Sequence, residues 1–383
     1  MYAAFYLLID ANALRYPYVL TPEHNPNVAE AAAILDGRLE LEFRGHDTAL
    51  YDGKVYNVYP PMFTLISLAA LQWRPEGVHL QVVFLLALPL PALAYLLFRL
   101  RTEKVWLAAA LALGYLFGTS VLPVLNRALA GGDVYHVNHL LSQLGLLIFL
   151  LDYFGRRRIW PGGIGLLIAV WSRQLTAVYL VPLVFVAAAG RAGATRRRRL
   201  GLAALCAVVI AALPMTLNAL KFGHPLKTGY RYVYEGLGTE SAERTLRTGL
   251  FSPVYALRNL YYMSLGFPSA ESINGIVRFK PNPWGTGIWW TTPLLLYLWV
   301  DLRRLWADRT VRGLLLAAVV AAAALLLYHN TGWLQEGYNR FSLDYVVVLL
   351  AVLAPRCDGF RRRVFTPVLT AWSVWYFRWV IAP

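Results

Sequence analysis

Long, predominantly apolar runs recur along the chain and determine its predicted secondary structure. Each run approaches the roughly 20 residues that an α-helix needs to cross about 30 Å of hydrocarbon. None shows the strict alternation of apolar and polar residues that a transmembrane β-strand requires, so each run predicts a helix. The clearest runs cover residues 78–98, 105–122, 137–154, 200–220 and 364–382. The pattern therefore predicts an all-α polytopic membrane protein.

Short basic segments separate many of these runs and predict which helix ends face the cytoplasm. More than half of the 36 lysine and arginine residues lie in five of them, at residues 99–104, 155–161, 191–199, 303–312 and 355–363. Such an excess of positive charge in short loops is typical of the cytoplasmic side. The net charge of +15 therefore indicates orientation and contact with anionic membrane lipids, and does not predict nucleic-acid binding.

Alternation of sides between the basic segments predicts about eleven membrane helices, with the C-terminus outside. They are expected at 1–14, 78–98, 105–122, 137–154, two within 162–190, 200–220, 286–302, 313–328, 342–355 and 364–381. The pair within 162–190 forms a hairpin with Arg173 near its turn, where the side chain either reaches a ligand or extends to the lipid headgroups. Two long outer loops, 15–77 and 221–285, complete a single integral membrane domain over residues 1–383.

Two short helices are predicted within the first outer loop. The segment Asn27–Leu35 follows Pro26, which is favoured at the first helical position, and precedes Gly37, which is favoured just after a helix. The segment Met62–Trp73 is too short to cross the bilayer, so we expect it to lie flat at the interface. The aromatic residues expected to anchor this region at headgroup level are Tyr51, Tyr56, Tyr59 and Trp73.

The composition agrees with a membrane protein, since 58% of the residues are hydrophobic and the mean hydropathy is +0.48. Cys206 and Cys357 lie in an apolar run and in a predicted cytoplasmic loop, so they do not predict a disulfide. The first apolar run, residues 1–14, is short for a complete span. Either further residues precede it, or its helix starts within the interface.

Polar residues that can carry chemistry collect on the predicted outer side. Ionisable groups at membrane depth are costly, which makes them functional candidates. They are Glu23 and His24, His46 and Asp47, Asp133, His136 and His139, His329, and Arg340 and Asp344.

Each candidate group also has a structural interpretation. Asp133, His136 and His139 either hold a divalent cation or cap a helix and hydrogen-bond to nearby loops. Arg340 and Asp344 are four residues apart, so they either pair on one face of a helix or contribute to a phosphate site. The sequence alone leaves both alternatives open.

Five stretches, in this order, resemble the bacterial polytopic C-type glycosyltransferase superfamily, which includes protein O-mannosyltransferases and lipid A aminoarabinose transferases. They are HNPNVAEAAAILDGRLEL, YDGKVYNVYPPMFTLI, IGLLIAVWSRQLTAVYLVP, NALKFGHPLKTGY and GWLQEGYNRFSLDY. The resemblance covers most of the chain and implies a helical bundle with interfacial helices in a large first outer loop. It also implies transfer of a sugar from a polyprenyl-phosphate donor to a glycan, lipid or protein acceptor, on the outer face of the bacterial cytoplasmic membrane.

That resemblance implies a base for the acceptor hydroxyl and cations for the phosphate leaving group. Similar enzymes place an aspartate just before the first interfacial helix, but this chain has His24 there, with Glu23 beside it. The expected bases are therefore His24, Glu23 and Asp133. The expected cations are Arg340, Arg173 and Lys227. Further expected substrate contacts are Tyr56, Tyr59, His136, Trp333 and Gln335.

Two other functions stay open from the sequence. A non-catalytic binder or flippase of lipid-linked glycans is compatible with Pro89, Pro91 and Pro182, which allow kinked helices, although charges within the predicted helices are few. A polymerase or ligase of surface polysaccharide would also use a long outer loop.

Overall fold

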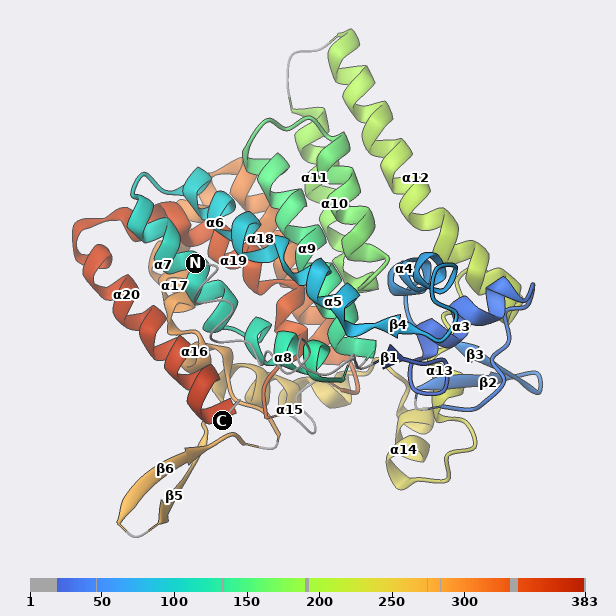
Figure 1. The fold of residues 1–383 in the computed structure, drawn as a ribbon. Coiled ribbons are helices and arrows are strands. Elements are labelled where there is room, and N and C mark those ends of the chain that lie inside the picture. The colour runs from blue at the N-terminus through green and yellow to red at the C-terminus, as the bar shows by residue number, and fades with distance from the viewer. Residues whose placement is uncertain are drawn as a thin grey trace.

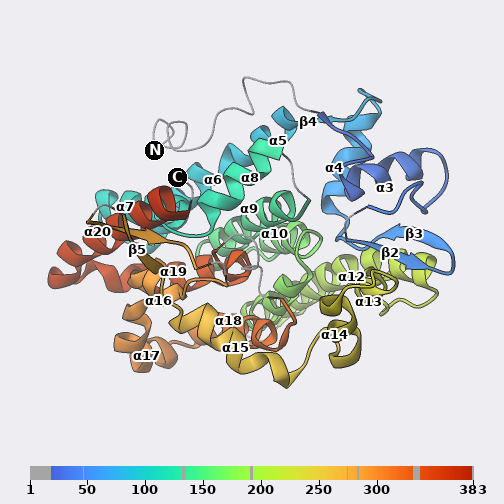
Figure 2. The same ribbon diagram turned by 90° about the horizontal axis from the view of Figure 1, so that it is seen from below.

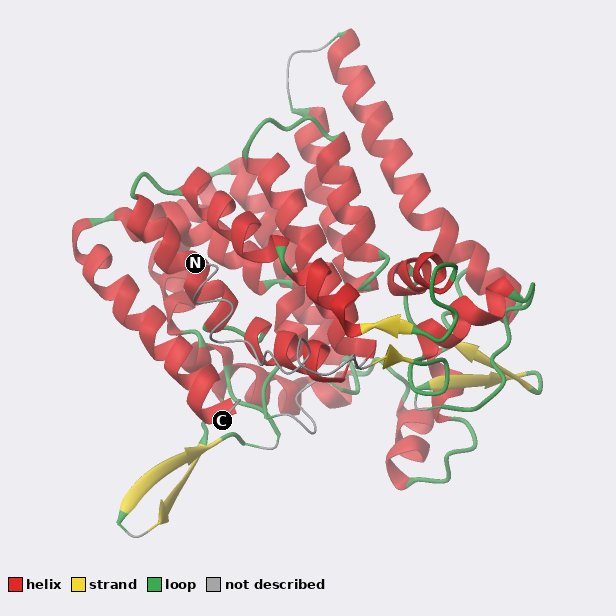
Figure 3. Ribbon diagram, viewed as in Figure 1, coloured by secondary structure: helices red, strands yellow, loops and turns green. Residues whose placement is uncertain are grey.

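The computed structural model describes residues 19–45, 47–131, 134–189, 193–273, 275–282, 284–330 and 337–381. Helices dominate these residues, and the strands are short and paired in twos (Figure 1 and Figure 3). The prediction of a mainly helical chain is therefore confirmed, and several of its helices are long and apolar enough to cross a membrane. The first predicted helix, residues 1–14, lies outside the described residues.

The helical bundle consists of α-helices and shorter 3₁₀ or π segments. Its α-helices are α5 (Leu80–Ala87), α6 (Pro89–Arg101), α7 (Val105–Phe117), α8 (Val121–Gly131), α9 (Val134–Phe154), α10 (Trp160–Val170), α11 (Leu180–Ala188), α12 (Ala194–Phe222), α16 (Ile288–Thr291), α17 (Tyr297–Ala307), α18 (Arg309–Leu327), α19 (Val346–Leu353) and α20 (Phe360–Trp375). The shorter segments are η1 (Gln174–Tyr179), η4 (Pro293–Leu296), η5 (Arg340–Asp344), η6 (Ala354–Asp358) and η7 (Tyr376–Ile381).

The two outer loops contain the remaining elements. In and around the first loop these are β1 (Val19–Leu20), α3 (Pro26–Leu35), β2 (Thr48–Tyr51), β3 (Lys54–Asn57), α4 (Met62–Leu71) and β4 (Val78–His79). In the second loop they are α13 (Tyr230–Tyr234), α14 (Glu240–Thr248), η2 (Pro253–Tyr255), α15 (Ala256–Leu260), η3 (Tyr261–Leu265), β5 (Ser269–Ile273) and β6 (Ile276–Lys280). The antiparallel pairs are β1–β4, β2–β3 and β5–β6.

Four described helices are long and apolar enough to cross a bilayer: Leu80–Arg101, α9, α12 and α18. A fifth candidate is the pair α7–α8, which bends by 54° where the sequence predicted one helix at 105–122. The predicted helix at 286–302 is also interrupted, because Pro293 lacks a backbone N–H and begins the separate segment η4. The total of about eleven crossings therefore stays a prediction.

Helix α9 forms the centre of the bundle, with 78% of its apolar window buried. It packs against α5, α6, α8, α10 and α19, and Figure 2 shows it surrounded by other helices. An added Cβ on Gly145 would lie 2.4 Å from the carbonyl oxygen of Gly165 in α10. Glycine is therefore needed for the close approach of these two helices, as is common between membrane helices.

Helix α12 lies at the periphery of the bundle and packs on α10 and α11. Only 11% of its apolar window is buried, so most of its side chains are available to lipid. In Figure 1, α12 and α20 both run from the upper side of the molecule, where their arginine-rich starts lie, towards the lower side. Elements of the second outer loop, α14, α15 and the β5–β6 pair, lie on that lower side. This arrangement agrees with the sidedness predicted from the basic segments.

Both helices predicted in the first outer loop are present, as α3 and α4. Asn25 caps α3 by accepting hydrogen bonds from two backbone N–H groups, and Pro26 occupies the first turn. Gly37 follows the helix with a φ of 76°, a conformation that glycine adopts readily. The β2–β3 pair and α13 pack together around Phe222, the last residue of α12. The first loop is therefore attached to the outer end of α12.

Candidate functional site

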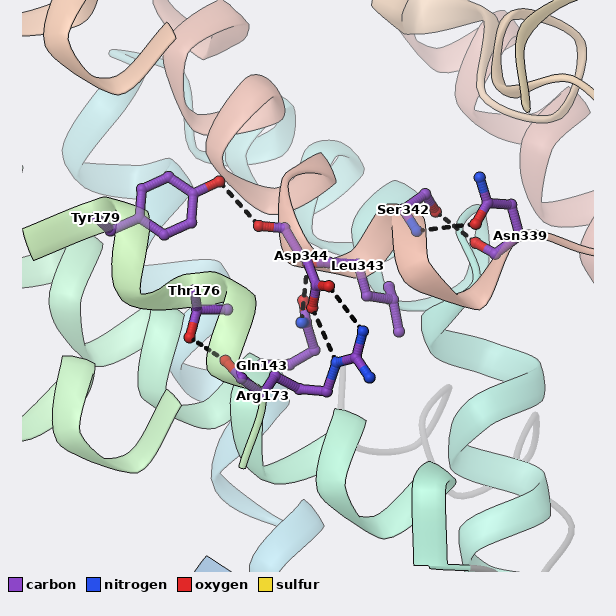
Figure 4. A network of polar contacts seen from close by, with 8 residues as sticks. All are labelled: Gln143, Arg173, Thr176, Tyr179, Asn339, Ser342, Leu343 and Asp344. Carbon is purple, nitrogen blue, oxygen red and sulfur yellow. Dashed lines mark hydrogen bonds and ion pairs between the residues drawn. The ribbon is translucent and has the colours of Figure 1, made fainter. Parts of the chain in front are cut away.

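A buried ion pair joins the turn of the α10–η1 hairpin to η5. The Nε and Nη2 atoms of Arg173 donate to the two carboxylate oxygens of Asp344 at 3.2 and 2.8 Å (Figure 4). The hydroxyl of Tyr179 donates to the backbone carbonyl of Asp344 at 2.8 Å. The Asp344 side chain is fully buried and that of Arg173 is 20% exposed. Two parallel charge-assisted hydrogen bonds fix both the position and the orientation of the guanidinium.

The Arg173–Asp344 pair replaces the Arg340–Asp344 pair, which was one of the two alternatives from the sequence. Residues 340–344 form a 3₁₀ segment rather than an α-helix. With about three residues per turn, residues four apart lie about 120° apart around the axis instead of on one face. Arg340 therefore points to different surroundings, and Asp344 is available to the hairpin.

Helix α9 supports η5 from beneath through Gln143. Its Nε2 donates to the backbone carbonyl of Leu343 at 3.0 Å, and its Oε1 accepts from the Tyr115 hydroxyl at 2.9 Å. At the other end of η5, the Ser120 hydroxyl donates to the carbonyl of Asn339 at 2.9 Å. Side chains from α7, from the junction of α7 and α8, and from α9 thus position the segment that carries Arg340.

The guanidinium of Arg340 is held among aromatic rings. Its carbon lies 4.8 Å from the ring centroid of Tyr135 and 5.3 Å from that of Phe341. The residue is only 7% exposed. Below it on α9, Nε2 of His136 lies 3.4 Å from the Tyr338 hydroxyl, and the ring of His139 lies 5.7 Å from that of Phe341. The sequence-predicted residues Arg340, Arg173 and His136 are thus brought into one buried group.

The alternative that Asp133, His136 and His139 hold a divalent cation stays a prediction, because the described residues include only the two histidines. Positive charge from Arg173 and Arg340 acts on His139 and would repel a metal ion there. Neither ring nitrogen of His139 has a hydrogen-bond partner among the described residues. No group of three or more histidine, cysteine, aspartate or glutamate side chains in the described part of the chain is placed to hold a metal. Asp133, the third predicted ligand, lies outside the described residues.

Asp47 and Tyr59 of the first outer loop form a hydrogen-bonded pair beside this group. The Tyr59 hydroxyl donates to Oδ2 of Asp47 at 2.7 Å, and Asp47 has a φ of 59°. Burial and the nearby carboxylate hold the pKa of Tyr59 well above its usual value near 10, so the phenol stays protonated as the donor. The Tyr59 ring lies 6.0 Å from that of Tyr135, which in turn contacts Arg340. Contacts of Tyr59 and Tyr135 therefore connect the Asp47 carboxylate to the Arg340 guanidinium.

Tyr230 of α13 lies close enough to both Arg173 and Asp47 for their charges to affect its pKa. Burial raises its pKa to about 12, while Arg173 opposes the shift and Asp47 adds to it. Nε2 of His329 and the Tyr234 hydroxyl form a hydrogen bond of 3.0 Å. Burial lowers the pKa of His329 to about 4. A cavity of about 200 Å³ in the second outer loop has Tyr234 in its wall. This cavity therefore lies beside Tyr234, whose pKa is raised by burial and by the Asp47 carboxylate.

The predicted bases Glu23 and His24 lie elsewhere, on the exposed turn before α3. Nδ1 of His24 is 2.8 Å from the Thr21 hydroxyl. A hydrogen bond with the same Thr21 is the main cause that lowers the pKa of Glu23, which weakens that carboxylate as a base. The structure does not bring either side chain into the buried group.

Lys227 and Tyr56 belong to an aromatic surface around the end of α12. Nζ of Lys227 lies 3.3 Å from the Tyr51 hydroxyl, a contact that raises the lysine pKa, and is fully exposed to solvent. The Tyr56 ring packs edge-on against Phe222 with centroids 5.6 Å apart. These two predicted contacts are therefore separate from the Arg340 group. The remaining predicted residues, His46, Asp133, Trp333 and Gln335, lie outside the described residues.

Sequence reasoning missed a buried polar network on α3. Glu30 forms an ion pair with Lys221 at the end of α12, and both side chains are almost fully buried. Oε2 of Glu30 also accepts from Asn57 at 2.8 Å and from Thr64 at 2.7 Å. The available signals were a single acid within an otherwise apolar helix and a lysine at the end of an apolar run. This network attaches α3, β3 and α4 to α12, so it fixes the first outer loop that presents Asp47.

Comparison with known proteins leaves the family of the chain open. No protein-family model matches it, and a search of curated proteins gives no match. Among solved structures, the crystal structure of ArnT from Cupriavidus metallidurans in the apo state is similar, with a TM-score of 0.47 and 13% sequence identity. The alignment covers 95% of this chain and 60% of the ArnT chain, so the chain spans less than two thirds of that protein. A similarity at this level carries no functional argument, and function is argued below from the site.

Proposed function

We propose that the protein is a membrane glycosyltransferase that moves a sugar from a polyprenyl-phosphate donor to an acceptor hydroxyl. The observation that carries this proposal is a series of contacts that links the Asp47 carboxylate to Tyr59, Tyr59 to Tyr135, and Tyr135 to the Arg340 guanidinium. Glycosyl transfer needs a base at the acceptor and a cation at the leaving phosphate, with the sugar between them. Aromatic faces suit the apolar faces of a sugar ring.

In the proposed reaction, Asp47 takes the proton of the acceptor hydroxyl. The acceptor oxygen forms a bond to the anomeric carbon while the bond from that carbon to the phosphate oxygen breaks. The polyprenyl phosphate leaves with an added negative charge, which the Arg340 guanidinium stabilises. Base catalysis of this kind typically contributes a factor of about 10²–10⁴ in rate. Tyr59 holds the Asp47 carboxylate in place by donating to one of its oxygens.

The other predicted residues take different places in this proposal. Arg173 acts as a positioning residue, since its guanidinium is committed to Asp344 and thereby holds η5. His136 is proposed to contact the donor phosphate or sugar beside Arg340. Lys227 is proposed to contact the acceptor outside the buried group, and Tyr56, which is 7% exposed, is proposed to support that contact by packing against Phe222. Glu23 and His24 are exposed, which leads us to prefer Asp47 as the base.

Asp133 remains a proposed alternative base from the sequence, and Trp333 and Gln335 remain proposed substrate contacts. The proposal places the donor tail in lipid, and the reaction on the outer face of a bacterial cytoplasmic membrane. Support for this sidedness comes from the basic segments, since the site lies on the loops opposite to them. A glycan, lipid or protein acceptor is expected to approach through the cavity beside Tyr234.

The test is transfer in vitro from radiolabelled polyprenyl-phosphate sugars to acceptors of each class, with purified protein in lipid nanodiscs. We expect Asp47→Asn to lower kcat about 10²–10⁴-fold. Arg340→Gln is expected to lower it about 10²–10³-fold, the cost typical for loss of one group that stabilises developing charge. Glu42→Gln is the matched control, because Glu42 is a 77% exposed carboxylate of the same loop, paired with Arg38.

Three outcomes would count against the proposed roles. Transfer that survives in both Asp47→Asn and Arg340→Gln would refute the site. Loss of transfer only in Glu23→Gln or His24→Ala would identify the catalytic base as a residue of the turn before α3. Wild-type protein that binds labelled donor and transfers nothing to any acceptor would instead support the non-catalytic binder.

A further inference from the structure

The β5–β6 hairpin has two chemically different faces. Its strands pair in register from Ser269 opposite Lys280 to Ile273 opposite Ile276. Side chains alternate between the two faces of a strand pair, so directly opposite residues share a face. One face carries Ala270, Ser272, Val277 and Phe279. The other carries Ser269, Glu271, Arg278 and Lys280, and the register places Ile273 and Ile276 on it next to the turn.

The charged face is organised for contact with water. Lys280 and Glu271 form an ion pair, with 58% and 44% of their side chains exposed. Arg278 is exposed and lies directly opposite Glu271 in the register. A cross-strand group of opposite charges stabilises the pair and needs no further partner.

The opposite face is apolar and remains open. Val277 is 61% exposed and Phe279 is 39% exposed. The Phe279 ring lies edge-on to Trp375 of α20, with centroids 6.4 Å apart. Exposed apolar side chains on one face, beside a polar opposite face, indicate a surface that contacts something other than water.

An aromatic row connects this face to two bundle helices. Trp375 lies 5.2 Å from Trp372, which lies 5.2 Å from Trp290 of α16, which lies 5.5 Å from Phe267 just before the hairpin. Both ends of the hairpin thus join the same row. Tryptophan and other aromatic residues gather at the boundary between hydrocarbon and headgroups, where their rings are partly apolar and partly polar.

The position of this row along α20 sets the depth of the hairpin. Helix α20 begins with an arginine-rich segment, and Trp375 is its last residue, about 20 Å further along the axis. Segment η7 continues the chain from Tyr376 to Ile381, so the row lies in the half of this continuous segment that is remote from the arginines. Figure 1 shows β5 and β6 leaving the bundle at that end of α20 and projecting beyond it.

We propose that the β5–β6 hairpin is an interfacial arm whose Val277–Phe279 face lies in the outer leaflet at the headgroup–acyl boundary, with its Arg278–Lys280 face in water. The partner is the lipid surface next to the protein, because the face continues the aromatic row of α20, which includes most of the membrane helix predicted at residues 364–381. The hairpin enlarges the area over which the second outer loop contacts the membrane, independently of the reaction proposed above.

Depth-dependent quenching of a fluorescent label tests this arm in the full-length protein. Cys206 and Cys357 are first replaced by alanine, and single cysteines are then introduced as Val277→Cys or Arg278→Cys and labelled with an environment-sensitive dye. These neighbours occupy opposite faces, so each is the control for the other. In nanodiscs containing brominated phosphatidylcholine, we expect the label at 277 to be quenched at least about twofold more than that at 278. Aqueous iodide is expected to quench in the reverse order.

A second pair guards against a locally misfolded variant. Ser272→Cys should behave as Val277→Cys, and Glu271→Cys as Arg278→Cys, because the register places them on the same faces. Equal access of iodide to both faces would overturn the proposal. A label at 277 protected from both quenchers would also overturn it, and would indicate that a protein surface covers this face.

Discussion

Replacement of Arg173 by glutamine is expected to destabilise the protein more than replacement of its partner Asp344 by asparagine. Removal of one member of a buried ion pair typically costs about 3–5 kcal/mol, because the other charge is left without compensation. Arg173→Gln leaves the carboxylate of Asp344, which is fully buried, without two hydrogen bonds. Asp344→Asn leaves a guanidinium that is 20% exposed and still lies 4.5 Å from the Phe341 ring. We therefore expect about 5 kcal/mol for the first variant and about 3 kcal/mol for the second.

The free energy of unfolding would be measured by titrating sodium dodecyl sulfate into protein in mild detergent, with tryptophan fluorescence as the signal. Arg362→Gln is the matched control, since Asp301 and Arg362 form a similar pair with 3% and 23% of their side chains exposed. That control should lose similar stability and keep transfer activity when both proteins are assayed folded, whereas Arg173→Gln should lose it. Equal costs for Arg173→Gln and Asp344→Asn, or costs below about 1 kcal/mol, would refute the reasoning.

Three further predictions follow from local features. Asn25→Ala should cost about 1 kcal/mol of unfolding free energy, because two N–H groups of α3 lose their acceptor. Gly145→Ala should cost about 1–3 kcal/mol by forcing α9 and α10 apart, whereas Gly201→Ala, with open space around it, should be neutral or stabilising in the same assay. His329 has a pKa near 4 when folded, below its unfolded value near 6.5, so stability should fall by about 2 kcal/mol between pH 7 and pH 5. The drop should be absent in His329→Gln, and an unchanged drop there would assign it to other groups.

Local signals in the sequence were sufficient for the elements that depend on near neighbours. Pro26 and Gly37 mark the ends of α3, and the hairpin within 162–190 has Arg173 at its turn. The ends of α3 and the hairpin turn are both set by residues only a few positions away, because capping groups, proline and glycine act over that range. The broken segments were harder to predict, because hydropathy does not distinguish a straight helix from one bent by 54° between α7 and α8.

The candidate site was predicted in part. Arg173, Arg340 and His136 were selected because charge at membrane depth is costly, and they do share one buried group. The base was sought at His24 and Glu23 from a resemblance in one stretch of sequence, yet these side chains are exposed. Asp47 was noticed only as part of a polar loop. Its hydrogen bond to Tyr59 depends on the β2–β3 pair, which returns the chain to the same place twelve residues later.

The sequence by itself was sufficient to predict a membrane protein. Each apolar run contributes its own free energy of transfer into lipid, and this contribution does not depend on contacts with other segments. The sequence also predicts a sidedness, because each basic segment favours the cytoplasmic side without reference to the others. Only the tertiary structure decided which charges meet. Arg173 pairs with Asp344, and Lys221 with Glu30, across more than 150 residues of sequence. Such pairing depends on distances of a few ångströms between backbones that approach only after the helices pack, because an electrostatic contact is set by separation in space and by the exclusion of water.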